Sequence, residues 1–152
     1  MKLARDLREF IELLNRHDVE YLLIGGWAFA FHATPRYTGD IDFLVKCNHE
    51  NAERLEKVLC DFGFGSLPGF KESFLKGDRI TQFGLPPNRI DILTKIDGVS
   101  FSEAVLDCIW GELDGLRLPV MSRAALIRNK LAAGRPKDIA DVEALKRTEP
   151  SA

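Results

Sequence analysis

The stretch from residue 21 to 45, YLLIGGWAFAFHATPRYTGDIDFLV, places two carboxylates inside an otherwise apolar run. Asp40 and Asp42 flank Ile41, and the apolar run continues beyond them. Side chains two residues apart in a strand point to the same face, so the acids should share one side while Ile41 faces the core. Buried carboxylates are costly, and like charges held together resist joint ionisation, so the pair needs a cation. The alternative is a strand that ends at the surface.

A glycine pair precedes the two acids. Gly25 and Gly26 follow a predicted buried strand, 19–24, and open a predicted short helix, 27–32. Glycine at such a junction lets a phosphate approach the backbone, where the N–H groups of a helix start favour an anion. Thirteen residues separate Gly26 from Asp40. We therefore expect a phosphate-binding turn beside a metal-binding pair, although glycine pairs are also common in ordinary turns.

Asp91 is a third candidate, because it lies between two isoleucines in the predicted strand 89–96. An acid there faces either solvent or a site. If this strand lies beside that of Asp40 and Asp42, three carboxylates converge. Three are enough to hold two divalent ions about 3.5–4 Å apart. Carboxylate oxygens suit hard cations, so the predicted cofactor is Mg²⁺, or Mn²⁺ in its place.

Helices and short strands mix throughout the chain, which predicts an α/β (α+β) fold with a short mixed sheet flanked by helices. The spacing of apolar residues predicts helices at 3–16, 49–61, 100–108, 122–133 and 136–147. Two hairpins are predicted, 70–75 with 79–83 and 109–113 with 116–120. We expect one domain over residues 1–152, with a helical tail at about 122–147.

Composition indicates a soluble globular protein, since 45% of the residues are hydrophobic and 29% are charged. No apolar run is long enough to cross a bilayer, and the acidic N-terminal helix is unlike a signal peptide. The three cysteines show neither disulfide nor metal-ligand spacing. The sequence therefore predicts a cytoplasmic protein without a membrane partner.

Charge is unevenly distributed along the chain. The net charge is −2, yet residues 121–147 hold seven basic and three acidic side chains. Such a segment is compatible with a polyanionic ligand, and equally with a solvated helix face. Within it, Lys137 and Asp141 have the spacing of an i,i+4 ion pair.

These motifs resemble the nucleotidyltransferase superfamily related to DNA polymerase beta. A closer similarity is to its small bacterial branch, which includes nucleotidyltransferase toxins of the abortive-infection type. In that branch a Gly-Gly…Arg-x-Thr-x-Asp-x-Asp stretch precedes a later Lys-x-x-Ala-x-Arg-x-Lys-Asp-type segment. Arg36 and Thr38 match the first pattern, and residues 130–138, KLAAGRPKD, approximate the second. The resemblance covers roughly residues 20 to 145.

The resemblance implies roles for seven residues. They are the metal-binding and catalytic carboxylates Asp40, Asp42 and Asp91, and the nucleotide-binding residues Gly25, Gly26, Arg36 and Lys130. Asp91 would also be the base for the acceptor hydroxyl. The expected reaction moves a nucleoside monophosphate from an NTP to a hydroxyl of RNA, tRNA or protein and releases pyrophosphate.

Two other functions are compatible with the sequence. One is a non-catalytic module that binds a nucleotide or a partner through a degenerate nucleotidyltransferase fold. The other is transfer to a small molecule of the aminoglycoside type. Because little of the chain is left for acceptor binding, an antitoxin partner or a homodimer is a further expectation of the toxin-like interpretation.

Overall fold

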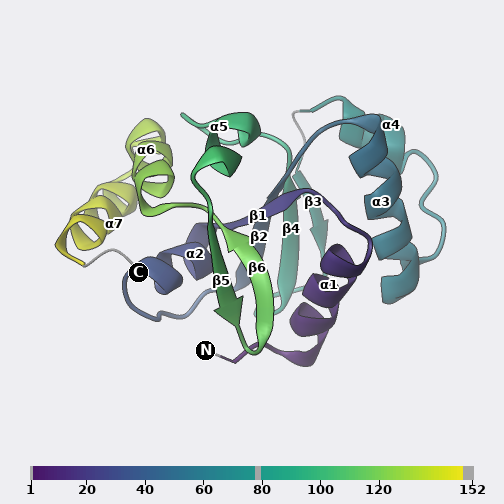
Figure 1. Ribbon diagram of the computed structural model, residues 1–152, viewed down its shortest axis with the longest axis horizontal. Helices are drawn as coiled ribbons and strands as arrows, with labels where there is room; N and C mark the ends of the chain where they lie inside the picture. The colour runs from purple at the N-terminus through teal and green to yellow at the C-terminus, as the bar shows by residue number, and fades with distance from the viewer. Residues whose placement is uncertain (1, 78–79, 149–152) are drawn as a thin grey trace.

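A six-stranded mixed sheet forms the centre of the computed structural model, which describes residues 2–77 and 80–148 (Figure 1). The strands are β1 (Tyr21–Ile24), β2 (Asp40–Val45), β3 (Ile80–Phe83), β4 (Arg89–Leu93), β5 (Ile109–Leu113) and β6 (Leu116–Val120). Their order across the sheet is β3-β4-β2-β1-β6-β5. β2 runs antiparallel to β1 and parallel to β4. The glycine turn and both acidic strands therefore meet in the middle of the sheet.

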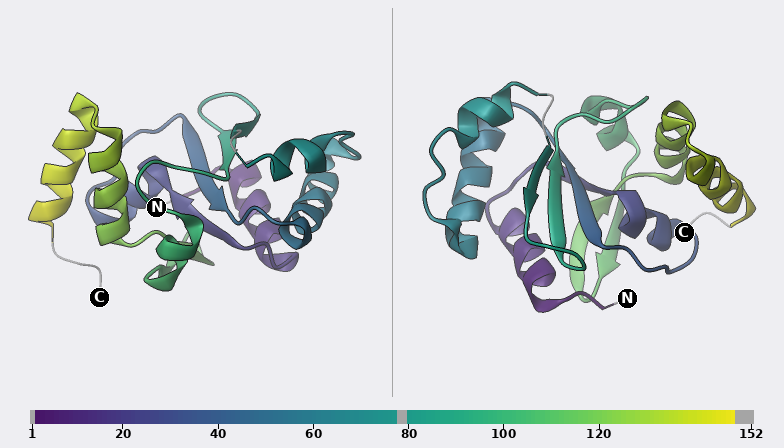
Figure 2. Two further views of the ribbon diagram at one scale, coloured as in Figure 1. Left: turned by 90° about the horizontal axis from the view of Figure 1, so that it is seen from above. Right: turned by 180° about the vertical axis from the view of Figure 1, so that it is seen from behind.

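Helices flank the sheet at both ends, which confirms the predicted architecture (Figures 1 and 2). They are α1 (Arg5–Arg16), α2 (Gly25–His32), α3 (His49–Leu59), α4 (Phe70–Leu75), α5 (Phe101–Leu106), α6 (Arg123–Ala133) and α7 (Pro136–Arg147), with a π-helical turn η1 (Cys60–Phe64) after α3. In Figure 1, α6 and α7 lie at one side of the sheet and α3 and α4 at the other. Among the described residues, no helix is long and apolar enough to cross a bilayer.

Alternation along β2 separates the core from the acids, as predicted. Ile41 and Phe43 are fully buried, and the Phe43 ring lies 5.8 Å from that of Phe10 on α1. Asp40 and Asp42 are half-buried on the opposite face. Burying one large apolar side chain contributes about 1.5–3 kcal/mol. A register slip of one residue would lose these contributions and drive both acids into the core, so the register is strongly specified.

Local capping explains where several helices begin and end. The side chains of Asn48 and Ser122 each accept a bond from a backbone N–H three residues further on, at 2.8 and 3.0 Å. Ser100 and Glu103 form a reciprocal capping box at the start of α5. Gly134 ends α6 with φ +68°. These predicted caps are confirmed.

The predicted strand at 70–75 is wrong, because these residues form the helix α4. Phe70 and Phe74 are buried and Glu72 is exposed. In a strand all three side chains would share one face, so Glu72 would be buried between the two rings. In a helix Glu72 turns away while residues four apart stay together.

The predicted first hairpin is wrong for the same reason. β3 pairs antiparallel with β4 rather than with residues 70–75. The predicted start of the second strand of this hairpin, Arg79, and Asp78 before it lie outside the described residues. β4 ends at Leu93, three residues earlier than expected.

Candidate active site

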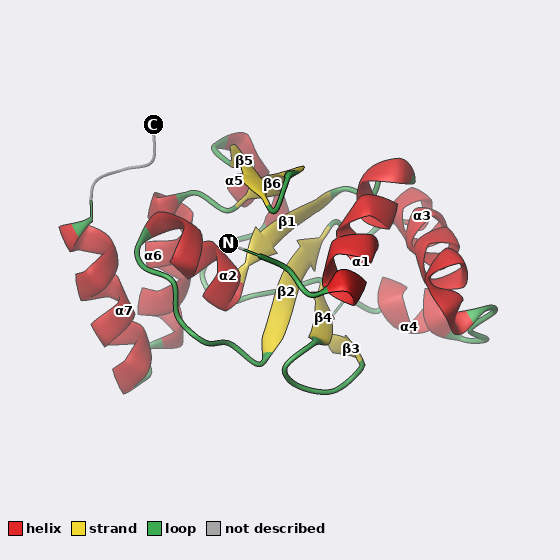
Figure 3. Cartoon of the chain, turned by 90° about the horizontal axis from the view of Figure 1, so that it is seen from below, coloured by secondary structure: helices red, strands yellow, loops and turns green. Residues whose placement is uncertain are grey.

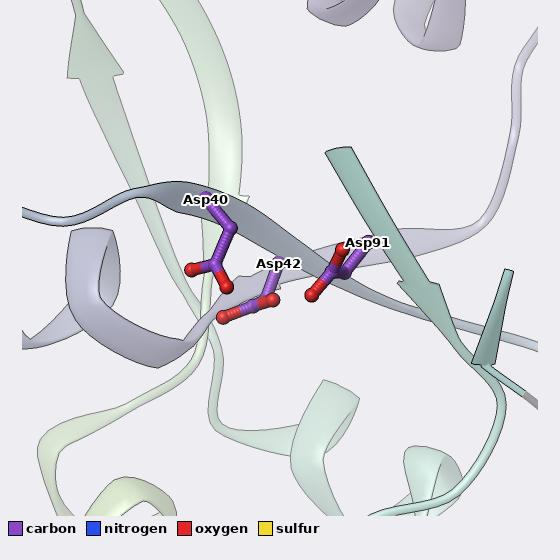
Figure 4. A group of neighbouring side chains, drawn as sticks. All are labelled: Asp40, Asp42 and Asp91. Atoms are coloured by element: carbon purple, nitrogen blue, oxygen red, sulfur yellow. The ribbon is translucent and has the colours of Figure 1, made fainter. Parts of the chain in front are cut away.

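Three carboxylates converge on two neighbouring strands and are called the carboxylate cluster below: Asp40, Asp42 and Asp91. Asp42 and Asp91 are direct partners in the parallel register of β2 and β4. One oxygen from each of the three side chains lies within 4.8 Å of the others. Figure 4 shows all three side chains projecting to the same side of the two strands. The predicted convergence is confirmed.

The glycine turn is built against this cluster. Gly25 opens α2 with φ +67°, and a Cβ atom there would lie 2.2 Å from Asp42 Oδ2. Only glycine leaves this space. A Cβ on Gly26 would lie 3.1 Å from Thr38 Oγ1, and that hydroxyl donates to the Asp40 carbonyl at 3.0 Å. The turn and the carboxylates are therefore one continuous surface.

Arg89 is a site residue that the sequence reasoning missed. Its Nη2 lies 2.6 Å from Asp40 Oδ2 and 3.1 Å from Asp91 Oδ2, and its Nε lies 3.0 Å from Asp91 Oδ1. The sequence does indicate this role, because Arg89 lies two residues before Asp91 in the same strand and its side chain is therefore on the same face.

Electrostatics show that the cluster has an excess of negative charge. The pKa of Asp42 rises from 3.8 to about 8. Burial is the largest cause, followed by the charges of Asp40 and Asp91 and a hydrogen bond with Asp91, while Arg89 opposes the shift. Three carboxylates facing one guanidinium fit a hard divalent cation, which takes oxygen ligands. Such a cluster is typical of metal-dependent nucleotidyltransferases.

A second group, the cationic cluster, comprises Arg36, Lys130 and Asp141. Arg36 binds Asp141 through two contacts of 2.7 and 3.0 Å, and Lys130 Nζ lies 2.7 Å from Asp141 Oδ2. Lys130 and Asp141 are buried, and the Arg36 guanidinium stacks over Phe29 at 4.0 Å. Burial alone would raise the pKa of Asp141, but the bonds and charges of the two cations outweigh it and lower that pKa.

The ionic partners in α6 and α7 differ from the simple i,i+4 expectation. Among the described residues, Asp141 pairs with Arg36 and Lys130 and not with Lys137. Asp138 is almost fully buried, and Arg135 Nε binds it at 2.6 Å. The hydrogen bond from Arg135 is the main cause that lowers the pKa of Asp138. The segment that resembled the second family motif therefore forms a connected ionic network.

Residues of both clusters line one cleft of about 440 Å³, although Asp91 is not among them. Gly25, Gly26, Asp40 and Asp42 line it together with residues of α6 and α7. Figure 3 shows α2 beside α6, between the sheet and the helical pair. The buried imidazole of His32 lies 2.7 Å from the Met121 carbonyl and so fastens the end of α2 to the segment before α6. All predicted nucleotide-binding residues therefore border one cleft.

A short mixed sheet with three strand carboxylates beside a glycine turn defines the class of protein, a nucleotidyltransferase. Solved structures with 16–17% identity support the fold. ANT(2")-Ia in complex with adenylyl-2"-tobramycin aligns with a TM-score of 0.58 over 91% of this chain and 84% of that one. The lincomycin-bound lincosamide antibiotic adenylyltransferase LnuA gives 0.53 over 95% and 97%. An antigenic nucleotidyltransferase-like protein from Paracoccidioides brasiliensis gives 0.53 over 92% and 74%.

The family follows from the sequence itself. Residues 12–152 match the model of the nucleotidyl transferase AbiEii toxin family, a type IV toxin–antitoxin system. The chain belongs to this family, which confirms the resemblance seen in its motifs and supplies the toxin–antitoxin context. No curated protein sequence matches the chain significantly.

Proposed function

We propose that this nucleotidyltransferase transfers a nucleoside monophosphate from an NTP to a hydroxyl group of an RNA acceptor, tRNA included, with Mg²⁺ or Mn²⁺ as cofactor. The observation that carries the proposal is the convergence of three carboxylates within 4.8 Å, directly against the glycine turn. Phosphoryl-group chemistry depends mainly on positioning and on neutralising charge, and this arrangement supports both.

The triphosphate would lie in the cleft between the two clusters. Gly25 and Gly26 offer backbone N–H groups at the start of α2, which favours an anion. Elsewhere in the cleft lining, three cations, Arg36, Lys130 and Arg135, are paired with two carboxylates, Asp138 and Asp141. The surplus charge is suited to phosphate oxygens.

Asp40, Asp42 and Asp91 would hold the divalent cation, which supplies charge neutralisation and lowers the pKa of the attacking group when it is bound. In the proposed step, Asp91 accepts the proton of the acceptor hydroxyl. The resulting oxygen attacks the α-phosphorus in line, and the bond from that phosphorus to the bridging oxygen breaks. Pyrophosphate leaves with that oxygen, and the acceptor keeps the nucleoside monophosphate.

The charge of the C-terminal helices favours RNA as the acceptor. Five exposed basic side chains lie on α6, α7 and their connection: Arg128, Arg135, Lys137, Lys146 and Arg147. Attraction of phosphates to such residues supplies much of the affinity for nucleic acids. A small-molecule acceptor is the second candidate, because two structures with the same fold contain an adenylylated aminoglycoside and lincomycin.

The test is transfer of label from each α-labelled NTP in the presence of Mg²⁺. Total tRNA, lysate protein and an aminoglycoside are compared as acceptors, with wild type, Asp42→Ala and the distant exposed control Asp6→Ala. We expect label on RNA with wild type and Asp6→Ala and loss of it with Asp42→Ala. Label on protein or on the aminoglycoside alone would reassign the acceptor. Thermal stabilisation by an NTP with Mg²⁺ but without label would indicate a non-catalytic nucleotide-binding module. The absence of both would leave a non-catalytic, partner-binding module as the better explanation.

A further inference from the structure

We infer that Arg89 is the internal counter-ion of the metal-free carboxylate cluster, so that a divalent cation enters the site by exchange with its guanidinium group. The inference rests on the proposed metal-dependent function, but it concerns a residue to which neither the fold nor the family motifs assign a role.

The register of the sheet places the Arg89 guanidinium beside two of the three carboxylates. Arg89 precedes Asp91 by two residues in β4, and in the parallel register with β2 its partner is Asp40. Its side chain therefore rises on the same face as both acids. The guanidinium spans the gap between the two strands and binds one carboxylate on each, at 2.6 Å from Asp40 and at 3.0 and 3.1 Å from Asp91.

Arg89 uses oxygens of two of the three carboxylates that could hold a metal ion. Arg89 engages both oxygens of Asp91 and one oxygen of Asp40. The other oxygen of Asp40 faces the Thr38 hydroxyl at 3.3 Å. Two of the three candidate ligands are thus already occupied by donors. A cation that binds Asp91 and Asp40 together therefore competes with the guanidinium for the same two carboxylates.

The charge and the exposure of Arg89 both bear on the exchange. Arginine stays protonated, so its charge competes with a metal ion but cannot be lost. The Arg89 side chain is 30% exposed, which gives it a route towards solvent when it is displaced. One guanidinium carries a single positive charge, which does not neutralise three carboxylates, whereas a divalent ion carries two. A displaced Arg89 then remains beside the cluster as a planar donor suited to phosphate oxygens.

The experiment is titration calorimetry with MgCl2 alone at about pH 9.5, where proton competition for the carboxylate ligands is weak. Wild type is compared with Arg89→Gln, Arg89→Lys and Arg16→Gln, a control that removes one exposed charge on α1. We expect Arg89→Gln to bind Mg²⁺ about tenfold more tightly than wild type, within the usual range of coupling between two sites. Arg89→Lys should lie between the two, because an ammonium group lacks the planar fork, and Arg16→Gln should match wild type.

Thermal melting supplies an independent measurement. In EDTA the Arg89→Gln protein should melt at a lower temperature than wild type, and Mg²⁺ should raise its melting temperature by a larger increment. If Arg89→Gln does not fold, Arg89→Lys makes the same test. Equal or weaker Mg²⁺ binding by the Arg89 variants, with clear binding by wild type, would overturn the exchange and leave the proposed function standing. Absence of Mg²⁺ binding by every variant, with and without NTP, would overturn both.

Discussion

The carboxylate cluster and the cationic cluster border one cleft but have opposite excess charge. The first has three acids and one arginine, and the second has two cations on one acid. The same residue type responds oppositely in the two places. The pKa of Asp42 is raised to about 8, mainly by burial and by its acidic neighbours, whereas that of Asp141 is lowered by Arg36 and Lys130 in spite of burial.

This difference shows which cluster is complete without a ligand. Asp141 has its counter-charges inside the chain, so it can serve as a structural joint between the loop before β2 and the helices α6 and α7. The carboxylate cluster lacks counter-charge even with Arg89 in place. A metal–nucleotide complex has a positive metal ion and negative phosphates. It therefore matches a cleft that has an excess of negative charge at the carboxylate cluster and of positive charge at the cationic cluster.

The largest expected effect comes from removing one charge of the carboxylate cluster. Asp42→Asn keeps the size of the side chain but removes a metal ligand and a transition-state charge partner. We expect kcat/KM for nucleotidyl transfer to fall by roughly 10³-fold or more. Steady-state kinetics measure this, and urea denaturation in EDTA should show that the metal-free fold is at least as stable as wild type. A drop in stability without a drop in activity would contradict the comparison.

Removing the acid of the cationic cluster should instead cost stability. Asp141→Ala removes the nearer acid of buried Lys130 and leaves it the weaker partner Asp138, 3.9 Å away. Breaking a buried pair in this way costs about 3 kcal/mol. The free energy of unfolding from urea denaturation measures the loss. The control is Asp141→Asn, which keeps an acceptor for both cations and should lose less. Equal stability of all three proteins would show that the joint is not structural.

A methyl group on the glycine turn should act on both properties. Gly25→Ala forces an L-residue into φ +67°, at about 1–2 kcal/mol, and places its Cβ against the Asp42 carboxylate. We expect lower stability together with weaker Mg²⁺ binding by calorimetry. Gly26→Ala is the matched control, because its added Cβ meets only the Thr38 side chain at a tighter than usual distance. The idea of one continuous surface fails if Gly26→Ala is the more damaging of the two.

The last expected effect is a pH dependence of the metal-free protein. Because the pKa of Asp42 is higher in the folded state than its ordinary 3.8, the folded protein holds this proton more tightly. The stabilisation is complete below about pH 3.8 and is lost as the pH rises towards about 8. In EDTA the melting temperature of wild type should therefore fall, relative to Asp42→Asn, between pH 5 and pH 8, and Mg²⁺ should reduce the difference. A constant difference would contradict the raised pKa.

The parts of the fold that follow from neighbouring residues could be predicted from the sequence. Alternation around Ile41 placed both acids on one face, and the caps at Asn48, Ser100 and Ser122 depend on residues three positions away. The segment 70–75 was misassigned because two phenylalanines four residues apart share a face in a strand and in a helix alike. Only the exposed Glu72 between them distinguishes the two.

The parts of the site that depend on register and on helix packing could not be predicted in this way. The contact of Arg89 with Asp40 exists because β4 lies parallel to β2 in one particular register. The partners of Asp141 come from a loop more than 100 residues earlier and from the preceding helix. A sequence shows that such charges exist, but only the folded chain shows which of them meet.

The order of the segments along the chain has a consequence for synthesis on the ribosome. The strands that carry Asp40, Asp42 and Asp91 are made before α7, which supplies Asp141. An elongating chain therefore contains all three carboxylates before Asp141 is available to bind Arg36 and Lys130. For a member of a toxin family, this order implies that a partly translated molecule has its acidic residues but not yet the complete cleft proposed to hold the nucleotide.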